Sequence, residues 1–151
     1  NYIKPEHTVL DLGCGSGILS IIAMLLGAKE ATAIDIDPSA VEIALKNAEK
    51  NGISVCNYHT IAGNIINDSN LCKKISQKHY DIIFANIVAD VIIALKPIVY
   101  NFMDDDTVLI TSGIINSRLD DVLNEYKNSP FEIRKISEKG EWASLTLTKR
   151  L

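Results

Sequence analysis

The sequence predicts an α/β protein built on a doubly wound, mostly parallel sheet of seven strands. Short apolar runs typical of buried strands alternate five times with longer segments, most of which have helical periodicity. A turn with three glycines follows the first run. Two final apolar runs, separated by residues 138–140, have the form of a β-hairpin, which places one antiparallel strand in the sheet.

The composition indicates one globular domain over residues 1–151. The chain is 47% hydrophobic, which is sufficient for one buried core. Its net charge of −4 gives no basic excess for binding nucleic acid, and no apolar run reaches the ~20 residues that span a bilayer. The three cysteines form no CxxC pair and are odd in number, which favours the reducing cytoplasm over a disulfide framework. No metal site is expected.

Each predicted strand is a short apolar run bounded by polar residues or glycine. In chain order the strands are expected at residues 8–13, 30–37, 54–61, 80–87 and 106–113, with hairpin strands at 131–137 and 141–149. In sheets of this class, ligands bind beyond the carboxyl ends of the parallel strands. We therefore expect a pocket formed by residues 11–17, 35–37, 61–64, 86–89 and 112–114.

The predicted helices occupy residues 18–28, 37–52, 89–103 and 116–128, and a polar stretch over 62–78 carries at least one helical turn. The first helix is apolar nearly all round and is expected to be buried, ending at Gly27. Asp37 is positioned to cap the second helix, with Pro38 in its first turn. Ser117 and Asp120 have the spacing of a capping box at the start of the last helix.

The glycine-rich turn carries the pattern DxGxGxG, formed by Asp11, Gly13, Gly15 and Gly17. The third glycine is out of register for the dinucleotide fingerprint GxGxxG, and the turn lacks the lysine of a P-loop. Alternating glycines let backbone N–H groups face a ligand closely, and the helix N-terminus behind them favours a carboxylate. Cys14 fits this turn as a small packing residue rather than as a nucleophile.

Asp35 ends the second predicted strand, with Ile36 beside it, and its two oxygens can accept hydrogen bonds from both hydroxyls of a ribose. The turn and this acid together resemble the S-adenosylmethionine-dependent methyltransferases with a seven-stranded Rossmann-like sheet. The resemblance implies that the turn holds the methionine part of S-adenosylmethionine and that Asp35 holds the ribose. That family often has an acid near the adenine after the third strand. This chain has Asn64 there, and its amide can also bond an adenine edge.

Residues 85–90 follow the fourth predicted strand, where this family often carries a motif that selects the methyl acceptor. Asn86 matches the first position of [DN]PP[YF], a motif common in methyltransferases of nucleobases and glutamine amides, but the prolines and the aromatic residue are absent. The absence of a stacking face argues against a flipped nucleobase. Asn86 and Ile87 are the predicted catalytic positions, because an amide oxygen orients an amine and a weakly polar pocket lowers the pKa of a lysine ammonium. Asn86 is also predicted to contact the cofactor. The three histidines are interpreted as packing or surface residues.

Five segments together are similar to the bacterial methyltransferases of the large-subunit ribosomal protein L-eleven, the PrmA family: residues 10–29, 33–52, 80–95, 109–114 and 138–147. The resemblance implies methylation of lysine side chains and of the N-terminal amine of that ribosomal protein. From the charge balance and the lack of a long apolar run, direct binding to nucleic acid or to a membrane is not expected. Members of this family also carry an N-terminal substrate-recognition domain. This sequence begins without methionine shortly before its first strand, so it is expected to hold the catalytic domain alone.

Alternative functions remain open at this point. The sequence is also consistent with a methyltransferase that acts on RNA or on a small molecule. A third alternative is a cofactor-binding domain without activity in isolation. The role of Trp142 is open as well, since it can pack under a helix or line the acceptor site.

Overall fold

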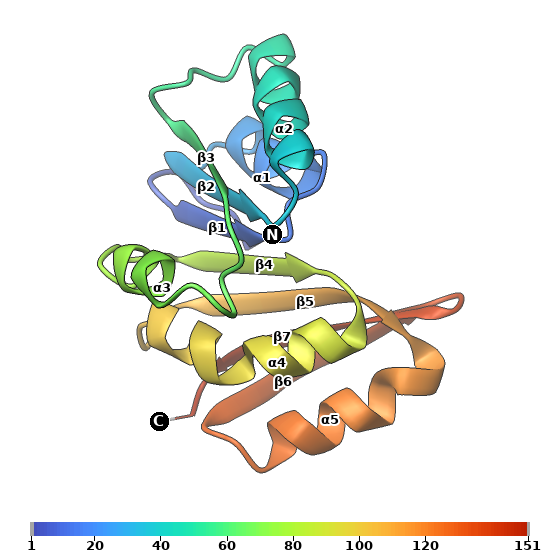
Figure 1. Ribbon diagram of the computed structural model, residues 1–151. Helices are drawn as coiled ribbons and strands as arrows, with labels where there is room; N and C mark the ends of the chain where they lie inside the picture. The colour runs from blue at the N-terminus through green and yellow to red at the C-terminus, as the bar shows by residue number, and fades with distance from the viewer. Residues whose placement is uncertain (1, 151) are drawn as a thin grey trace.

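The computed structural model describes residues 2–150, which form a seven-stranded sheet with helices on both faces (Figure 1). The strands are β1 (Thr8–Leu12), β2 (Glu30–Asp35), β3 (Tyr58–Ala62), β4 (Ile82–Asn86), β5 (Val108–Ile115), β6 (Phe131–Lys139) and β7 (Trp142–Lys149). The helices are α1 (Ile18–Leu25), α2 (Pro38–Lys50), α3 (Ser69–Ile75), α4 (Ala89–Val99) and α5 (Leu119–Lys127), with short 3-10 turns η1 (Tyr100–Phe102) and η2 (Asn116–Arg118). Within residues 2–150, no helix is long and apolar enough to cross a membrane.

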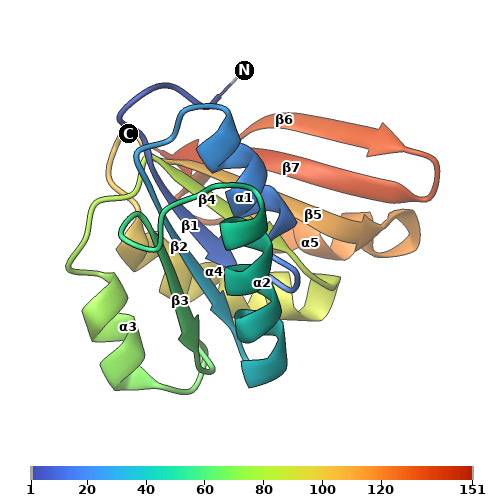
Figure 2. The ribbon, with the colours of Figure 1, turned by 90° about the horizontal axis from the view of Figure 1, so that it is seen from above.

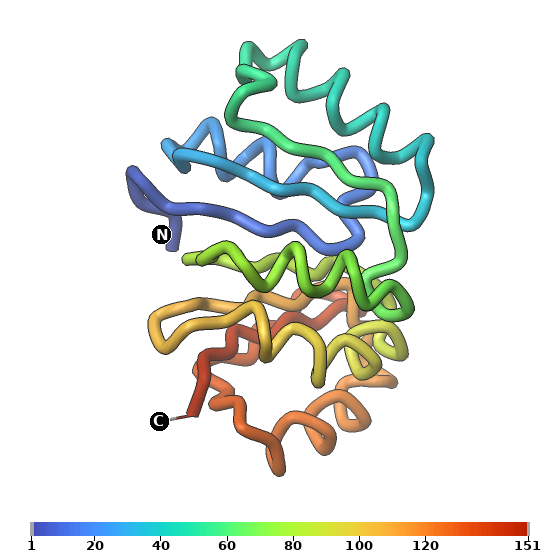
Figure 3. Tube along the Cα trace, turned by 60° about the vertical axis from the view of Figure 1, so that its left-hand side comes forward, coloured from blue at the N-terminus to red at the C-terminus, as the bar shows by residue number. Residues whose placement is uncertain are grey.

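The strand order β3-β2-β1-β4-β5-β7-β6 confirms the predicted sheet. Neighbouring strands from β3 to β5 pair in parallel, and β7 runs antiparallel to both β5 and β6. The chain starts in the middle of the sheet at β1, moves outward to β3, and returns to build the other half from β4 onward (Figure 3). The strand order therefore reverses between β1 and β4, where a ligand crevice is expected at the carboxyl ends.

Two apolar cores lie on opposite faces of the sheet, because alternate side chains of a strand point to opposite faces. On β1, Val9 belongs to the core under α1 and α2, whereas Leu10 and Leu12 belong to the core that contains α3, α4 and α5. Figure 2 shows α1 and α2 side by side along the β1–β3 half of the sheet. Asp11, between the two leucines, is consequently directed to the α1 side.

Helix α1 is not buried on all sides, contrary to the prediction. Ile18, Ile22 and Leu25 are 54%, 44% and 58% exposed, although Ile21 and Ala23 are buried. The three exposed side chains have i, i+4, i+7 spacing and so form one stripe facing solvent. The helix packs through one face only. Because its other face is also apolar, the hydrophobic pattern of the sequence does not show which face is buried.

The predicted cap at Asp37 is confirmed, whereas the one at Ser117 is wrong. Asp37 Oδ1 accepts a 2.8 Å hydrogen bond from the backbone N–H of Ser39. Helix α5 begins after η2, which contains Ser117, and has no side-chain cap bond. The reason is that Asn116 is bound to the tip of the β6–β7 hairpin. Its backbone N–H donates to the carbonyl of Glu141, and its side-chain NH₂ donates to the carbonyl of Gly140.

The third strand is shorter than predicted. It begins at Tyr58 rather than at residue 54. Residues 54–57 form a turn, closed by a 3.0 Å bond from the N–H of Asn57 to the carbonyl of Ser54. The apolar run extends over a turn that hydrophobicity alone does not reveal.

Replacing Asp37 with alanine is expected to lower the free energy of unfolding by about 1 kcal/mol, because the Ser39 N–H loses its acceptor. The matched control Ser117→Ala is expected to change it by less than about 0.5 kcal/mol, because no cap bond is lost. Urea denaturation of the two variants measures both values. If the two variants lose the same free energy of unfolding, the hydrogen bond of Asp37 to the N–H of Ser39 does not stabilise the fold.

Candidate functional site

A hollow of about 430 Å³ opens where the carboxyl ends of β1 to β4 meet. Its walls come from four chain segments, and its lining is mostly apolar: Leu12, Gly13, Ile34, Asp35, Ile36, Gly63, Asn64, Ile65, Ile66, Ile87, Val88, Val91 and Leu95. Five of the residues selected from the sequence are among them, namely Gly13, Asp35, Ile36, Asn64 and Ile87. Asp35 is the one ionisable side chain of this lining.

The glycine turn and the segment after β4 touch at Gly13. A Cβ placed on Gly13 would lie 2.4 Å from Cγ2 of Ile87, closer than any real side chain allows, and Gly13 has a left-handed φ of 71°. Ile87 is itself held by a 3.1 Å hydrogen bond from its N–H to the carbonyl of Ser112. The predicted ligand-binding turn and the predicted acceptor segment are therefore in direct contact.

Asp35 stands at the rim of the hollow with each carboxylate oxygen held by the backbone. Oδ2 accepts a 2.8 Å bond from the N–H of Gly15, and Oδ1 accepts a 3.0 Å bond from the N–H of Asp37. One such bond leaves each oxygen with further accepting capacity. Ile36, beside it, is 68% exposed and offers an apolar face at the mouth of the hollow.

Asp11 lies beneath the turn and does not line the hollow. It is 1% exposed, and its Oδ2 accepts hydrogen bonds from the N–H and the hydroxyl of Ser20, at 3.1 and 2.7 Å. The Ser20 hydroxyl is also 2.9 Å from the Tyr58 hydroxyl. Burial raises the pKa of Asp11, and the bonds from Ser20 oppose that rise. The geometry makes Asp11 a support for the turn rather than a wall of the hollow.

Gly17 packs the end of the turn directly onto this buried network. A Cβ on Gly17 would lie 2.5 Å from the Tyr58 hydroxyl and 3.0 Å from Cβ of Ala44, and its φ is 79°. Burial also raises the pKa of Tyr58 to about 12, so its hydroxyl stays protonated. Glycine at this position lets α1, α2 and β3 approach one another closely under the turn.

Cys14 is buried in the turn, as expected of a packing residue. Burial raises its pKa to about 12, because the thiolate would be desolvated near two carboxylates. At pH 8, about one Cys14 side chain in ten thousand is then the reactive thiolate. Gly15 and Cys14 shape the turn without lining the hollow.

A thiol reagent at pH 8 is expected to modify the exposed Cys56 at least about a hundred times faster than Cys14, because the reactive thiolate of Cys14 is scarce and buried. Peptide mass spectrometry over a time course measures the two rates. Comparable rates would contradict the buried, protonated state of Cys14.

Asn64 begins the connection from β3 to α3. Its Oδ1 accepts a 3.0 Å bond from the N–H of Ile66, so the side-chain NH₂ remains available as a donor at the hollow. The neighbouring Gly63 donates its N–H to the carbonyl of Asp35 over 2.9 Å, which joins this loop to the end of β2.

Asn86 ends β4 and is exposed next to the hollow, against Gly113 of β5. A Cβ on Gly113 would lie 3.0 Å from Oδ1 of Asn86 and 2.9 Å from the carbonyl oxygen of Ile87. Gly113 has a φ of 78° and lies where the β5–β7 register shifts, between Thr111 and Ile114. This irregularity lets the β5 backbone approach the predicted acceptor position.

Three supporting residues were not identified from the sequence. Ser20 could have been recognised, because it is the one polar residue in an otherwise apolar predicted helix. Gly113 lies within the predicted strand end 112–114, but no supporting role was assigned to it there. Tyr58 carried no signal, because its partner Ser20 is 38 positions away. Distant pairings of this kind depend on strand order rather than on local pattern.

Trp142 does not pack under a helix, which removes one of its two predicted roles. It is 56% exposed at the start of β7 and is paired across the strands with Ile115, which is 43% exposed. Because β7 is antiparallel, its first residue lies at the same edge of the sheet as the end of β5. Trp142 does not line the hollow, and its role toward the acceptor stays a hypothesis.

A second hollow, of about 470 Å³, lies along β3 and is separate from the glycine turn. Two side chains of its lining lie beside one carboxylate, since Glu30 pairs with Lys78 and is 3.1 Å from Nε2 of His59. His59 is therefore a partly exposed neighbour of Glu30 and lies apart from the glycine turn.

Comparison with known proteins identifies relatives along the whole chain. Residues 1–150 match the family model described as ribosomal protein L11 methyltransferase (PrmA). Ribosomal protein L11 methyltransferases of Lachnospira eligens and Caldicellulosiruptor bescii are 40% and 39% identical to it over 150 and 149 residues. Each match covers 99% of this chain, but 47% and 45% of those relatives. The chain thus spans about half the length of the curated relatives it matches.

Solved structures agree with this fold. The ribosomal protein L11 methylase from Lactobacillus delbrueckii subsp. bulgaricus has a TM-score of 0.86 and 31% identity, covering 99% of this chain and 72% of that one. An RNA methyltransferase from Salinibacter ruber, in complex with S-adenosyl-L-homocysteine, has a TM-score of 0.72 and 19% identity, covering 95% of this chain and 80% of that one. At that lower identity the likeness concerns the fold alone.

Proposed function

The chain belongs to the ribosomal protein L11 methyltransferase family, and we propose that it binds S-adenosylmethionine and transfers methyl groups to amino groups of ribosomal protein L11. The acceptors are lysine side chains and the N-terminal amine, and the reaction takes place in the cytoplasm, a compartment that suits the free Cys14, Cys56 and Cys72. The observation that carries the proposal is the contact of Gly13 with Ile87 at one mostly apolar hollow.

The residues of the hollow suit the three parts of S-adenosylmethionine. Gly13 lines the hollow without a side chain of its own, which suits close approach of the methionine part beside Ile87. Asp35 has accepting capacity for ribose hydroxyls, since each oxygen receives one backbone bond. The NH₂ of Asn64 is a donor for an adenine edge, and Ile36 and Ile65 offer apolar surface for its faces.

When bound, S-adenosylmethionine supplies a methyl group activated by a positively charged sulfur. The residues after β4 then have to present an uncharged amine to it. We infer that Oδ1 of Asn86 and the carbonyl oxygen of Ile87, which lie together against Gly113, accept the amine's N–H bonds. The apolar side chains of Ile87 and Val88 disfavour an ammonium and so lower a lysine pKa from its ordinary ~10.4.

Two measurements test the proposal in sequence. Calorimetry of this chain with S-adenosylmethionine is expected to give one site per chain, and no binding at about 1 mM cofactor would overturn it. The complete gene product is then incubated with large ribosomal subunits and methyl-labelled cofactor. Label in ribosomal protein L11 is expected, and label in RNA instead would overturn the substrate assignment.

Replacing Gly113 with alanine is expected to lower kcat of the complete enzyme about 10- to 100-fold, because the new Cβ displaces Asn86 from the acceptor. The Kd for S-adenosylmethionine is expected to stay within about twofold, because Gly113 does not line the hollow. Gly140→Ala is the matched control, since its φ is also positive, at 61°, but no atom lies within 4 Å of its Cβ position. If kcat falls by the same factor in both variants, the loss does not come from the contact of residue 113 with Asn86.

A further inference from the structure

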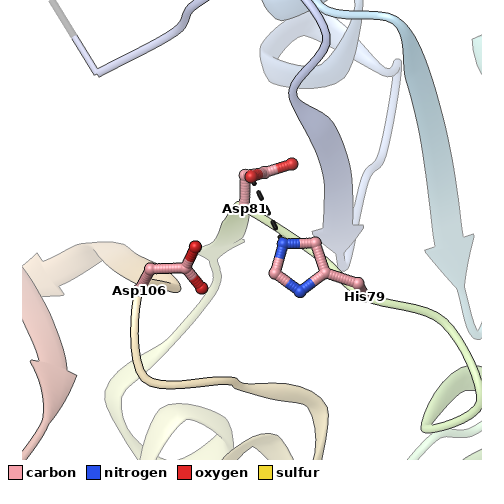
Figure 4. A group of neighbouring side chains, drawn as sticks. All are labelled: His79, Asp81 and Asp106. Atoms are coloured by element: carbon pink, nitrogen blue, oxygen red, sulfur yellow. Dashed lines mark hydrogen bonds and ion pairs between the residues drawn. The ribbon is translucent and has the colours of Figure 1, made fainter.

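A cluster of side chains lies at the edge of the sheet opposite the hollow. His79 and Asp81 immediately precede β4, and Asp106 precedes β5 (Figure 4). One donor atom from each of the three lies within 4.8 Å of the others. The cluster brings an imidazole and two carboxylates together from segments 25 positions apart, so sequence spacing gave no indication of it.

The imidazole of His79 is oriented by a carboxylate on its far side. Nδ1 is 2.5 Å from Oδ2 of Asp104, and Nε2 faces Oδ1 of Asp81 at 3.3 Å. When Nδ1 donates its proton to Asp104, Nε2 keeps its lone pair for a ligand. Proteins orient metal-binding histidines by this pairing of the other ring nitrogen with a carboxylate.

Asp81 is also fixed by its own neighbours. Its Oδ2 accepts bonds from the N–H and the hydroxyl of Thr8, at 2.7 and 3.0 Å, and its Oδ1 is turned toward His79. With Oδ2 held by Thr8, Asp81 presents Oδ1 to the centre of the cluster.

Negative charge exceeds positive charge around His79. Asp104, Asp105 and Asp106 are consecutive, and Asp81 is the fourth carboxylate. Over residues 2–150, none of these four carboxylates forms an ion pair with a lysine or an arginine, and those of Asp81 and Asp104 pair with His79. A cation bound between Nε2 and the carboxylates would balance this negative charge.

We propose that His79, Asp81 and Asp106 bind one divalent transition-metal ion of the Zn²⁺ type. A neutral imidazole with carboxylate oxygens suits Zn²⁺, which takes four ligands and leaves one position here for water. The ion would join the starts of β4 and β5 and, through Thr8, the start of β1. The site is remote from the hollow, so its role is to stabilise the sheet rather than to take part in methyl transfer.

The test uses ZnCl₂ with the Cys56→Ser chain, because the exposed thiol of Cys56 would otherwise bind Zn²⁺ itself. Calorimetry is expected to give one Zn²⁺ per chain, and Tm is expected to rise by on the order of 5 °C at a hundredfold excess over Kd. His79→Gln and Asp106→Asn are each expected to weaken binding at least tenfold. His59→Gln is the matched control, because His59 is a partly exposed histidine beside a carboxylate elsewhere, and this variant should bind Zn²⁺ unchanged.

Two outcomes would overturn the metal site. One is the absence of stoichiometric Zn²⁺ binding by a chain that circular dichroism shows to be folded. The other is binding by His79→Gln as tight as by His59→Gln. Asp106 is exposed, so its replacement leaves the fold intact even if His79→Gln is destabilised. None of these results depends on S-adenosylmethionine, so they are independent of the proposed methyltransferase activity.

Discussion

Replacing Gly17 with alanine is expected to lower the free energy of unfolding by about 3 kcal/mol. Part of this loss is backbone strain, since an alanine at a φ of 79° costs about 1 kcal/mol. The larger part is steric, because the new Cβ would lie 2.5 Å from the Tyr58 hydroxyl and 3.0 Å from Cβ of Ala44. Tyr58 must then move from its place beside Ser20, or α2 must shift.

Gly15→Ala is the matched control for the steric part. Gly15 has a φ of 52°, but no atom lies within 4 Å of the position of its Cβ. Its replacement is therefore expected to cost about 1 kcal/mol, the backbone strain alone. Urea denaturation without cofactor compares the two variants. If Gly17→Ala costs no more than Gly15→Ala, the close packing of the turn onto Tyr58 contributes nothing to stability.

Replacing Asp35 with asparagine is expected to weaken S-adenosylmethionine binding about 10- to 100-fold while leaving the chain folded. The change preserves the shape of the side chain but removes the ionised acceptor shared by the N–H groups of Gly15 and Asp37 and, as proposed, by the ribose hydroxyls. Bonds to an ionised carboxylate are stronger than bonds to a neutral amide, which gives the expected range. Calorimetry with S-adenosylmethionine measures the change in Kd.

Asp37→Asn removes the same charge two residues away and serves as the control. Asparagine caps a helix about as well as aspartate, so the bond to the N–H of Ser39 is kept. The Kd of this variant is expected to stay within about twofold of the original value. If Asp37→Asn weakens binding as much as Asp35→Asn, the effect is one of general charge, and the specific role assigned to Asp35 is wrong.

The fold was predictable because most of its determinants are local. The order of strands and helices follows from apolar runs, and the Asp37 cap follows from two adjacent residues. The position of the hollow was also predictable, since a parallel sheet gathers the ends of its strands at one edge. Gly13, Asp35 and Asn64 come together there although they are distant in sequence.

The remaining features depend on contacts between distant segments. The cap expected at Ser117 does not form, because Asn116 is held by the tip of a hairpin that lies more than twenty residues later. The close approach of Gly113 to Asn86 depends on a register shift between β5 and β7, for which the sequence has no local pattern. The exposed stripe of α1 was missed because apolar composition does not show which face packs.

The position of β7 between β5 and β6 has a consequence for how the chain is made. The ribosome synthesises β7 last of the described strands, yet β7 fills an inner place in the sheet. Until Trp142–Lys149 has emerged, β5 presents an open edge that can pair with other chains, and the core lacks Ala143, Leu145 and Leu147. The nascent chain therefore completes its fold only after translation has passed this segment, and a shortened chain lacking β7 would be prone to aggregate.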